Sequence, residues 1–227
     1  MISPDNSLWL QFWRDQRSDF HQDAVNPLLI KFWPELDLAA GSRIFVPLCG
    51  KSLDMIWLLE QGHEVVGVEL SPVAVQAFFQ ENRLKPRRKK RGKFTEWQHG
   101  KLSILCGDYF SLTPAHLGAI DTVYDRAALT ALPETIRADY VGHLRQIIPD
   151  SSRIFLLTTE DAEDNQTRSQ AFGVADEIAT LYQQDFMIDL THVDSELEPN
   201  HDTPGQQAKT TEYKVYVLRN KSDALIG

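Results

Sequence analysis

The sequence predicts an α/β protein with a mostly parallel β-sheet, and three observations support this prediction. Short apolar runs alternate with amphipathic stretches of helical period along most of the 227 residues. Between Ile44 and Leu70, an apolar strand, a glycine-containing loop, an amphipathic helix and a second apolar strand follow one another, as in a βαβ unit. The last apolar run, Tyr213–Arg219, alternates and is rich in β-branched residues, which is typical of an antiparallel edge strand.

Length and composition favour one globular domain. No continuous apolar segment approaches membrane-spanning length, so no membrane association is expected. The first residues, including Asp5 and Asn6, lack the basic and apolar regions of a signal peptide, which favours a cytoplasmic location. Two cysteines, Cys49 and Cys106, are too few for a disulfide or zinc framework, so no metal is expected. The formal net charge of −9 argues against general nucleic-acid binding.

The segment before the first strand is rich in aromatic residues. Short helices are expected at Leu8–Phe12 and Asn26–Trp33, with a loop at Arg14–Asp23 between them. The aromatic side chains have two interpretations: they fill a core over the sheet edge, or they form a lid whose rings face an organic cation. They are Trp9, Phe12, Trp13, Phe20, Phe32 and Trp33.

The loop Pro47–Ser52 and Glu69 are expected at the same edge of the sheet. A right-handed crossover brings the carboxyl ends of both strands together. A carboxylate about 20 residues after such a loop commonly accepts hydrogen bonds from ribose hydroxyls, and Glu69 lies 19 positions after Gly50. The alternative is that Glu69 only caps the next helix, although Ser71 is placed to cap that helix itself.

The same loop excludes two nucleotide-binding motifs. It has one glycine, so it lacks the three glycines that let a backbone approach a pyrophosphate. Gly50-Lys51-Ser52 resembles the end of a phosphate-binding P-loop, but Phe45 stands where that motif needs glycine. A ligand with a ribose and no phosphate chain fits better, and S-adenosylmethionine is the commonest such ligand.

Charged residues follow two further predicted strands at their carboxyl ends. Asp108 and Tyr109 follow the third strand, where an acid is placed to accept from an adenine amino group; the alternative is that it closes the turn. Asp125 and Arg126 follow the fourth strand and are predicted to border the same cleft, with a surface ion pair as the alternative.

The elements in order predict a Rossmann-like class I methyltransferase sheet, mostly parallel, with an antiparallel C-terminal hairpin, helices on both faces and an N-terminal helical lid. The expected strands are Ile44–Val46, Val65–Glu69, Leu102–Cys106, Asp121–Tyr124, Arg153–Thr159, Met187–His192 and Tyr213–Arg219. The later helices are expected at Ser71–Asn82, Pro133–Ile148 and Val174–Tyr182. Polar loops are expected at Lys85–Lys93, Glu160–Ala171 and Asp194–Lys209.

The chain is expected to be one methyltransferase domain over residues 1–227. Residues 1–40 form the lid and residues 41–227 the sheet core, with substrate-cover loops near 160–172 and 194–210. The basic run within Lys85–Lys93 is interpreted as a solvated loop. A nuclear-localisation or nucleic-acid patch is the alternative.

Several motifs resemble the thiopurine S-methyltransferase family, most closely its bacterial branch, and they span most of the chain. The matching segments are Trp9-x-x-x-Trp13, Phe20-His21, Asn26-Pro27, Val46-Pro47-Leu48-Cys49-Gly50-Lys51-Ser52-Leu53-Asp54, Gly67-Val68-Glu69-Leu70-Ser71, Phe78-Phe79 and Tyr124-Asp125-Arg126-Ala127-Ala128-Leu129. The resemblance implies S-adenosylmethionine-dependent methylation of thiopurines or aromatic thiols, with S-adenosylhomocysteine as product and no metal. Bacterial members are also associated with selenium and tellurium compounds.

Roles for individual residues follow partly from the resemblance and partly from the chemistry of methyl transfer to a thiolate. Arg126 is expected to position an anionic acceptor, and Asp125 or His21 to remove a proton from a less acidic one. Phe20 and Phe172 are expected to contact the substrate. The cofactor contacts are expected at Trp9, Trp13, Leu48, Gly50, Glu69, Leu70, Asp108, Tyr109 and Arg126. The expected partner is a small-molecule thiol or metalloid acceptor, with neither nucleic acid nor membrane, and the protein is expected to be a monomer.

The departures from the family concern the substrate cover. Ser169-Gln170-Ala171-Phe172 stands where the family usually has a Gly-Pro-Pro-Phe-type segment. Glu160 replaces an aliphatic residue and Ala162 an aromatic one. The methyl donor is therefore better supported than the acceptor. Two alternatives stay open: a class I methyltransferase with a different small-molecule acceptor, and a cofactor-binding protein with a degenerate acceptor site.

Overall fold

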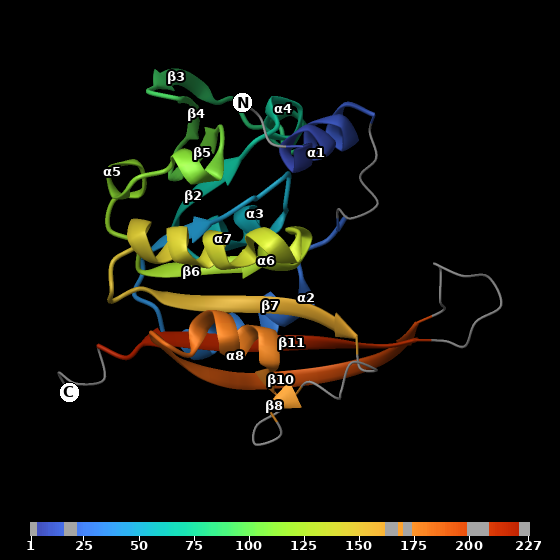
Figure 1. Ribbon diagram of the computed structural model, residues 1–227. Coiled ribbons are helices and arrows are strands. Elements are labelled where there is room, and N and C mark those ends of the chain that lie inside the picture. The colour runs from blue at the N-terminus through green and yellow to red at the C-terminus, as the bar shows by residue number, and fades with distance from the viewer. Residues whose placement is uncertain (1–3, 16–21, 162–167, 170–173, 199–208, 223–227) are drawn as a thin grey trace. The chain divides into compact units, whose positions relative to one another are not determined.

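The computed structural model of the chain describes residues 4–15, 22–161, 168–169, 174–198 and 209–222 (Figure 1). The chain forms two compact units, Met1–Thr122 and Val123–Gly227. None of the described helices combines the length and the hydropathy that a membrane crossing requires.

The first unit is built on five strands in the order β1-β2-β5-β4-β3. β1 pairs with β2, and β2 with β5, in parallel, whereas β4 and β3 are antiparallel additions. The bounds are β1 Arg43–Val46, β2 Glu64–Glu69, β3 Arg87–Arg91, β4 Phe94–His99 and β5 Leu102–Cys106. The three strands predicted in this part of the chain are confirmed, and they form its parallel centre.

The helices expected in the first unit are present, together with short helical turns that were not predicted. They are α1 Pro4–Arg14, α2 Pro27–Phe32, η1 Trp33–Leu36, α3 Asp54–Glu60, α4 Pro72–Glu81, η2 Tyr109–Ser111 and α5 Pro114–Leu117. The predicted cap of α4 is confirmed, because Ser71 Oγ accepts from Ala74 N at 3.4 Å. The buried face of α4 includes Phe78 and Phe79, so the apolar side of this helix supplies part of the core.

The predicted loop at residues 85–93 was wrong, because most of it forms strand β3. Gly92 and Lys93 make a two-residue turn between the paired residues Arg91 and Phe94, and Gly92 has φ +59°. The side chains of Phe94 and Trp97 on β4 are buried in the core of the first unit, and this burial holds the hairpin in place. The charged strand is therefore ordered by its apolar partner.

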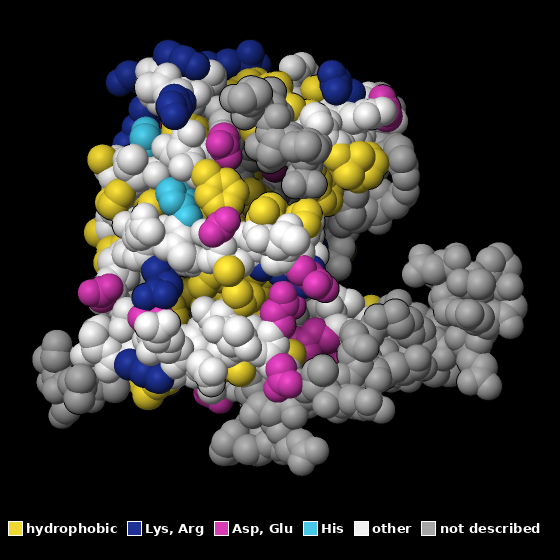
Figure 2. All heavy atoms as spheres, in the orientation of Figure 1, with side chains coloured by type: hydrophobic (Ala, Val, Ile, Leu, Met, Phe, Trp, Pro, Cys, Tyr) yellow, Lys and Arg dark blue, Asp and Glu magenta, His cyan; other side chains and the backbone are white. Residues whose placement is uncertain are grey.

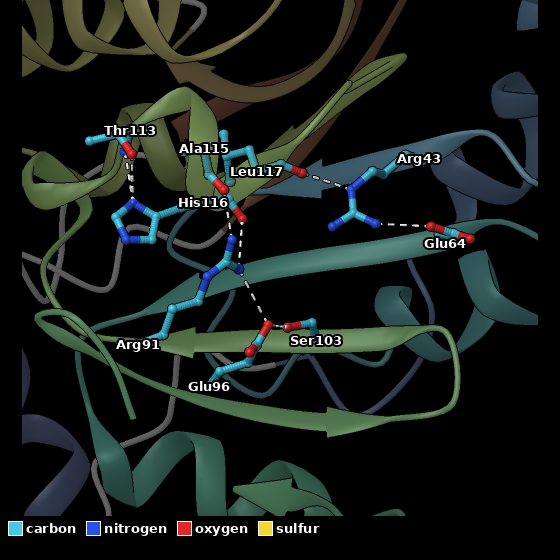
Figure 3. Close-up of polar contacts among 9 residues, drawn as sticks. All are labelled: Arg43, Glu64, Arg91, Glu96, Ser103, Thr113, Ala115, His116 and Leu117. Atoms are coloured by element: carbon cyan, nitrogen blue, oxygen red, sulfur yellow. Dashed lines mark hydrogen bonds and ion pairs between the residues drawn. The ribbon is translucent and has the colours of Figure 1, made fainter. Parts of the chain in front are cut away.

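Two arginines fix the short helix α5 (Figure 3). Arg43 Nε donates to the carbonyl of Leu117 at 2.7 Å, and Arg91 donates to the carbonyls of Ala115 at 2.6 Å and His116 at 3.0 Å. These carbonyls belong to the last turn of α5, which has no helical partners for them. Cationic donors at a helix C-terminus also suit its partial negative charge.

The main sheet of the second unit has the described strands β10-β11-β7-β6 in this order, and β8 and β9 pair separately with each other. β7 and β11 are antiparallel, as are β11 and β10, so the predicted C-terminal hairpin is confirmed (Figure 1). Its elements are β6 Thr122–Arg126, α6 Ala128–Ala131, α7 Glu134–Ile147, β7 Arg153–Asp161, β8 Arg168–Ser169, β9 Val174–Ala175, α8 Asp176–Tyr182, β10 Phe186–Glu198 and β11 Lys209–Asn220.

The strands of this hairpin are longer than predicted. β7 continues through Glu160 and Asp161, and β10 continues to Glu198, so the predicted loops 160–171 and 194–209 were wrong at these positions. The cause is cross-strand pairing: Glu160 pairs with Glu212, and Glu198 pairs with Lys209. Residues 162–167, 170–173 and 199–208 of these loops lie outside the described ranges.

His63 is buried and accepts a hydrogen bond at Nε2 from Trp33 Nε1 at 3.1 Å. This bond requires a neutral ring with its proton on Nδ1. Burial lowers the pKa of His63. Because the unfolded chain takes up the proton first as the pH falls, protonation of His63 opposes folding below its ordinary pKa of about 6.5.

We therefore expect the free energy of unfolding to respond to His63 below pH 6.5. The His63→Gln variant keeps an acceptor for Trp33 and does not titrate, so the wild type should lose stability relative to this variant between pH 7.5 and 5.5. Urea unfolding of both proteins at three pH values measures this. Glu69 and Asp125 have raised pKa values and act in the opposite direction, but they cancel in the comparison. A constant difference across the range contradicts the prediction.

Candidate active site

The loop after β1 folds back onto β2. Cys49 N donates to the Val68 carbonyl at 2.9 Å, outside any regular strand pairing. Leu48 and Gly50 both have left-handed backbone conformations, with φ +45° and +52°. This conformation is uncommon for a leucine, and such residues cluster at ligand-binding sites. The turned backbone directs the Gly50 N–H toward the end of β2.

Glu69 is held at the end of β2 by backbone donors on both sides. Its Oε2 accepts from Gly50 N at 2.9 Å, and its Oε1 accepts from Ser71 N at 2.7 Å. The residue is only 6% exposed. Burial raises the pKa of the Glu69 carboxyl to about 7, although the bonds from Ser71 and Gly50 act against this rise. The loop and the acid predicted to share a sheet edge are therefore in direct contact.

The indole of Trp13 lies against the same loop. A Cβ built on Gly50 would come within 3.2 Å of Trp13 Cζ2, so the glycine is needed for this close approach. Trp13 is 7% exposed, and Trp9 packs edge-on against Phe12 with ring centroids 5.7 Å apart. Helix α1 thus contributes a packed aromatic surface beside Gly50.

Asp108 and Tyr109 follow β5, whose last residue, Cys106, pairs with Glu69. Asp108 Oδ1 accepts from Phe110 N at 3.1 Å and starts the 3-10 turn η2. Tyr109 is buried, whereas Phe110 is 43% exposed. The turn-closing contact that was the alternative for Asp108 is present, and the contact with adenine stays a prediction.

Asp125 and Arg126 end β6 in the second unit. Asp125 is fully buried and accepts from the Tyr140 hydroxyl at 2.7 Å and from Leu129 N at 3.4 Å. Burial raises the pKa of Asp125 to about 6, and the bond from Tyr140 opposes this rise. The hydrogen bonds described for Asp125 join β6 to α6 and α7, so they give this carboxylate a fold-stabilising role. Ala127, with φ +62°, then turns the chain into α6.

The Tyr140→Phe variant is expected to lose about 1–3 kcal/mol of stability at pH 8, because a buried carboxylate loses its hydroxyl donor. The loss should be smaller at pH 5, where the native carboxyl, with its pKa of about 6, is mostly protonated and the lost bond is a neutral one. Urea unfolding at both pH values measures the two losses. A larger loss at pH 5 than at pH 8 contradicts this account of Asp125.

A buried ionic network joins β7 and β11 near the carboxyl end of β7. The side chain of Lys214 has no exposed surface and forms ion pairs with Glu160 and, at 3.2 Å, with Glu212. Glu160 also accepts from the hydroxyls of Thr158 at 2.7 Å and Tyr216 at 3.0 Å. From the sequence, Glu160 was expected only as a departure from the family, and this network was not predicted.

The two cysteines flank Glu69. Burial, followed by the Glu69 charge, raises the pKa of Cys49 well above its ordinary value and that of Cys106 to about 11. Cys49 Sγ lies where a side chain on Gly67 would project, because a Cβ there would come within 2.8 Å of it. Both thiols are therefore protonated at neutral pH.

Comparison with known proteins identifies the family. The sequence profile described as thiopurine S-methyltransferase matches residues 4–221. The chain belongs to the thiopurine S-methyltransferase family. A thiopurine S-methyltransferase of Stutzerimonas stutzeri is 56% identical over 99% of this chain and 94% of its own length. One from Methylococcus capsulatus is 40% identical over 97% of this chain and its full length. The protein is accordingly an S-adenosylmethionine-dependent methyltransferase.

Solved structures confirm the class I methyltransferase fold. A methyltransferase of Anabaena variabilis, described as dependent on S-adenosylmethionine, matches with a TM-score of 0.62 at 15% identity and covers 95% of each chain. The 1,6-didemethyltoxoflavin-N1-methyltransferase of Burkholderia thailandensis, solved with S-adenosylhomocysteine, matches with a TM-score of 0.57 at 15% identity. It covers 95% of this chain and 86% of that one.

The first unit of this thiopurine S-methyltransferase family member has donor groups that fit S-adenosylmethionine. Each Glu69 oxygen uses one acceptor position for a backbone amide and has another to offer a ribose hydroxyl. The Trp13 indole packs directly on Gly50 of the same loop, and an aromatic ring of this kind is suited to a sulfonium. Among the described residues, no group of three or more His, Cys, Asp or Glu is arranged to hold a metal ion.

The predicted site residues differ in what the structure shows of them. The structure brings Trp13, Gly50 and Glu69 together in the first unit, with Leu48 in the same loop. Asp125 and Arg126 belong to the second unit, and their part in a common cleft stays a prediction. Phe20, His21 and Phe172 lie outside the described residues. Trp9 and Leu70 are partly buried neighbours of the residues that the structure brings together, and their ligand contacts stay predictions.

Proposed function

We propose that this methyltransferase methylates the sulfur of thiopurines and other aromatic thiols, and that it also accepts selenium and tellurium compounds. The observation that carries the proposal is the 56% identity, over 99% of the chain, with a protein named thiopurine S-methyltransferase. The metalloid acceptors follow from the resemblance of the sequence motifs to the bacterial branch of the family.

In this proposal the protein binds and aligns the reactants and needs no covalent residue. When bound, the cofactor supplies an electrophilic methyl group on a positively charged sulfur. Glu69 accepts from the ribose hydroxyls, and Trp13 covers the loop and excludes water. Arg126 would position an anionic acceptor so that its nucleophile faces the methyl group that the bound cofactor supplies. Because nucleophile and sulfonium both lose charge during the reaction, a drier site favours transfer.

The experiment that tests the acceptor uses labelled S-adenosylmethionine. The protein is incubated with 6-mercaptopurine and thiophenol, with selenite and tellurite in excess glutathione, which supplies the electrons for their reduction to nucleophilic selenide and telluride, and with phenol and a purine without sulfur as matched controls. The proposal expects label in the sulfur acceptors and in volatile selenium or tellurium products, and none in the controls. Cofactor binding without transfer to any sulfur, selenium or tellurium acceptor contradicts it and favours another acceptor or a degenerate site.

The Arg126→Ala variant is expected to lower kcat roughly tenfold to a hundredfold, because it removes a cationic donor that stabilises the anionic nucleophile in place. The dissociation constant of S-adenosylmethionine should change less than twofold to threefold. Steady-state kinetics with thiophenol and calorimetry with the cofactor separate the two effects. Arg126→Lys, which keeps the charge, is the matched control and should retain more of kcat. Loss of stability with an unchanged kcat assigns Arg126 a structural role.

A further inference from the structure

The hairpin β3–β4 concentrates positive charge in an otherwise acidic protein. Residues 83–101 contain nine of the 23 Lys and Arg residues and one of the 32 Asp and Glu residues. This segment therefore carries a formal charge of +8, and the rest of the chain carries −17. A patch of this strength within an acidic protein attracts polyanions locally despite the unfavourable net charge.

The structure makes this patch an ordered surface. β3 lies at the end of the strand order, so one edge of it pairs with no other described strand. Figure 2 shows Lys and Arg side chains gathered over β3 and β4. Arg87, Arg88, Lys89 and Lys90 are all exposed, as is Lys93 in the turn. Within the described ranges, none of these five cations forms an ion pair.

Arg91 differs from the other cations of β3 because its side chain contacts α5. Arg91 turns toward α5, donates to its carbonyls and pairs with Glu96 at 3.4 Å (Figure 3). Glu96 in turn accepts from Ser103 at 3.0 Å. The single acid of the segment is therefore already engaged. The contacts of Arg91 hold β3 in place, so the backbone that carries the exposed cations of this strand is ordered.

Arg88 forms the outer layer of an aromatic stack. Its guanidinium carbon lies 3.6 Å from the centroid of the Trp97 ring, and Trp97 stacks on Phe79 at 5.8 Å with an interplanar angle of 16°. This cation–π contact holds the guanidinium flat on the indole. Because Arg88 is exposed, its opposite face is open to a planar ligand.

We propose that the β3–β4 hairpin binds single-stranded nucleic acid, with the exposed cations on phosphates and a base stacked on Arg88. Cationic grooves combined with aromatic or guanidinium stacking surfaces are the features that recognise single strands. This inference revises the expectation of no nucleic-acid partner, because that expectation treated the basic run as a solvated loop. Charged edge strands also prevent sheet-to-sheet aggregation, but that task does not require the Arg88–Trp97 stack.

The surface fits other polyanions less well. A membrane surface is usually engaged by apolar side chains together with cations. The exposed large apolar residues of the described chain lie outside β3 and β4; they are Leu8, Ile30, Val73, Phe110, Met187 and Val193. An acidic protein would form ion pairs with the exposed cations, but it has no planar base to stack on the Arg88 guanidinium.

The test measures fluorescence anisotropy of a labelled 12-nucleotide single strand with the full chain. With four phosphate contacts from the exposed cations other than Arg88, affinity should fall about fiftyfold between 50 and 200 mM salt. The duplex of the same sequence should bind more weakly than the single strand. A poly-glutamate peptide and phosphatidylserine vesicles are the competing probes. Tighter binding of either one, equal binding of duplex and single strand, or no binding at 50 mM salt overturns the proposal.

Matched variants separate charge from stacking. Arg87→Gln/Lys89→Gln/Lys90→Gln should weaken binding at least about tenfold and lower the logarithmic salt slope by about 2. Lys31→Gln/Arg219→Gln/Lys221→Gln removes the same charge elsewhere and should change affinity less than twofold. Arg88→Lys should keep the salt slope but lose about fivefold or more in affinity for the single strand. Equal losses of affinity for the single strand in both triple variants, or an unaltered affinity in Arg88→Lys, overturn the proposal.

The outcome does not depend on the methyl acceptor. The hairpin variants alter no residue assigned to the cofactor or acceptor, so methyl transfer to thiophenol should be unchanged in all of them. Failure of nucleic-acid binding therefore leaves the proposed function intact, and failure of thiol methylation leaves this inference intact.

Discussion

Replacing Lys214 with Met is expected to lower the free energy of unfolding by about 3–5 kcal/mol, because removal of one partner leaves buried charge without compensation. The Lys214 side chain is fully buried, and the carboxylates of Glu160 and Glu212 both pair with it. Without the ammonium group the two carboxylates face each other across paired strands, where like charges are destabilising. Urea unfolding at pH 7.5 measures the loss.

The matched controls separate the network from the mutation itself. Lys221→Met removes an exposed lysine just beyond the same strand, whose side chain donates to the Gln183 carbonyl, and should cost less than about 0.5 kcal/mol. Lys214→Met combined with Glu160→Gln and Glu212→Gln removes all three charges and should recover much of the loss. A loss below about 1 kcal/mol in the single variant, or no recovery in the triple one, contradicts the account.

Replacing Glu69 with Ala is expected to weaken S-adenosylmethionine binding by about 1–3 kcal/mol, roughly 5- to 150-fold, because charged hydrogen bonds to the ribose are lost. The variant also removes the acceptor for Gly50 N and Ser71 N, so the loop itself loses its tie to β2. Calorimetric titration with the cofactor measures the affinity. Glu81→Ala, which removes the exposed partner of Lys51 in the same loop, is the control and should bind nearly as the wild type.

The affinity should also depend on pH in a defined direction. The pKa of Glu69 is about 7, and only the ionised carboxylate has all its acceptor positions available for hydroxyls. Cofactor binding favours the ionised form, so affinity should rise as the pH increases from 6 to 8. The side chain in the Glu69→Gln variant does not titrate, so the affinity of this variant for S-adenosylmethionine should depend little on pH. An equally flat profile in the wild type is incompatible with ribose recognition by this acid.

The parallel centre of the first unit could be predicted because its signals are local. Each strand is a short apolar run, and the spacing between Gly50 and Glu69 follows from the lengths of one helix and one strand. The direct bond from Gly50 N to Glu69 then needs only the standard crossover.

Strand β3 could not be predicted in the same way. A run of five basic residues has no apolar alternation, so its sequence carries no strand signal. Its conformation comes from β4, where Phe94 and Trp97 are buried, and from the Gly92 turn. The informative signal lay in the segment after β3, because a glycine turn followed by spaced aromatic residues indicates a hairpin.

The environments of Asp125 and Lys214 depend on distant parts of the chain. Asp125 was placed at a cleft because it follows an apolar strand, but Tyr140 on α7 takes up one of its oxygens. Lys214 and Glu160 are 54 positions apart and meet only through the register of β7 and β11. A sequence pattern defines the faces of a strand, whereas the partner on each face is decided by packing.

The burial of Cys49 has a consequence for an enzyme of this family. An enzyme that binds an activated methyl group must keep its own thiolates from competing with the acceptor. Thiolates are the reactive form, and the pKa of Cys49 is raised well above its ordinary value while that of Cys106 is about 11. Both sulfurs thus stay in the unreactive acid form, and the sheet protects the catalyst from inactivation by its own reagent.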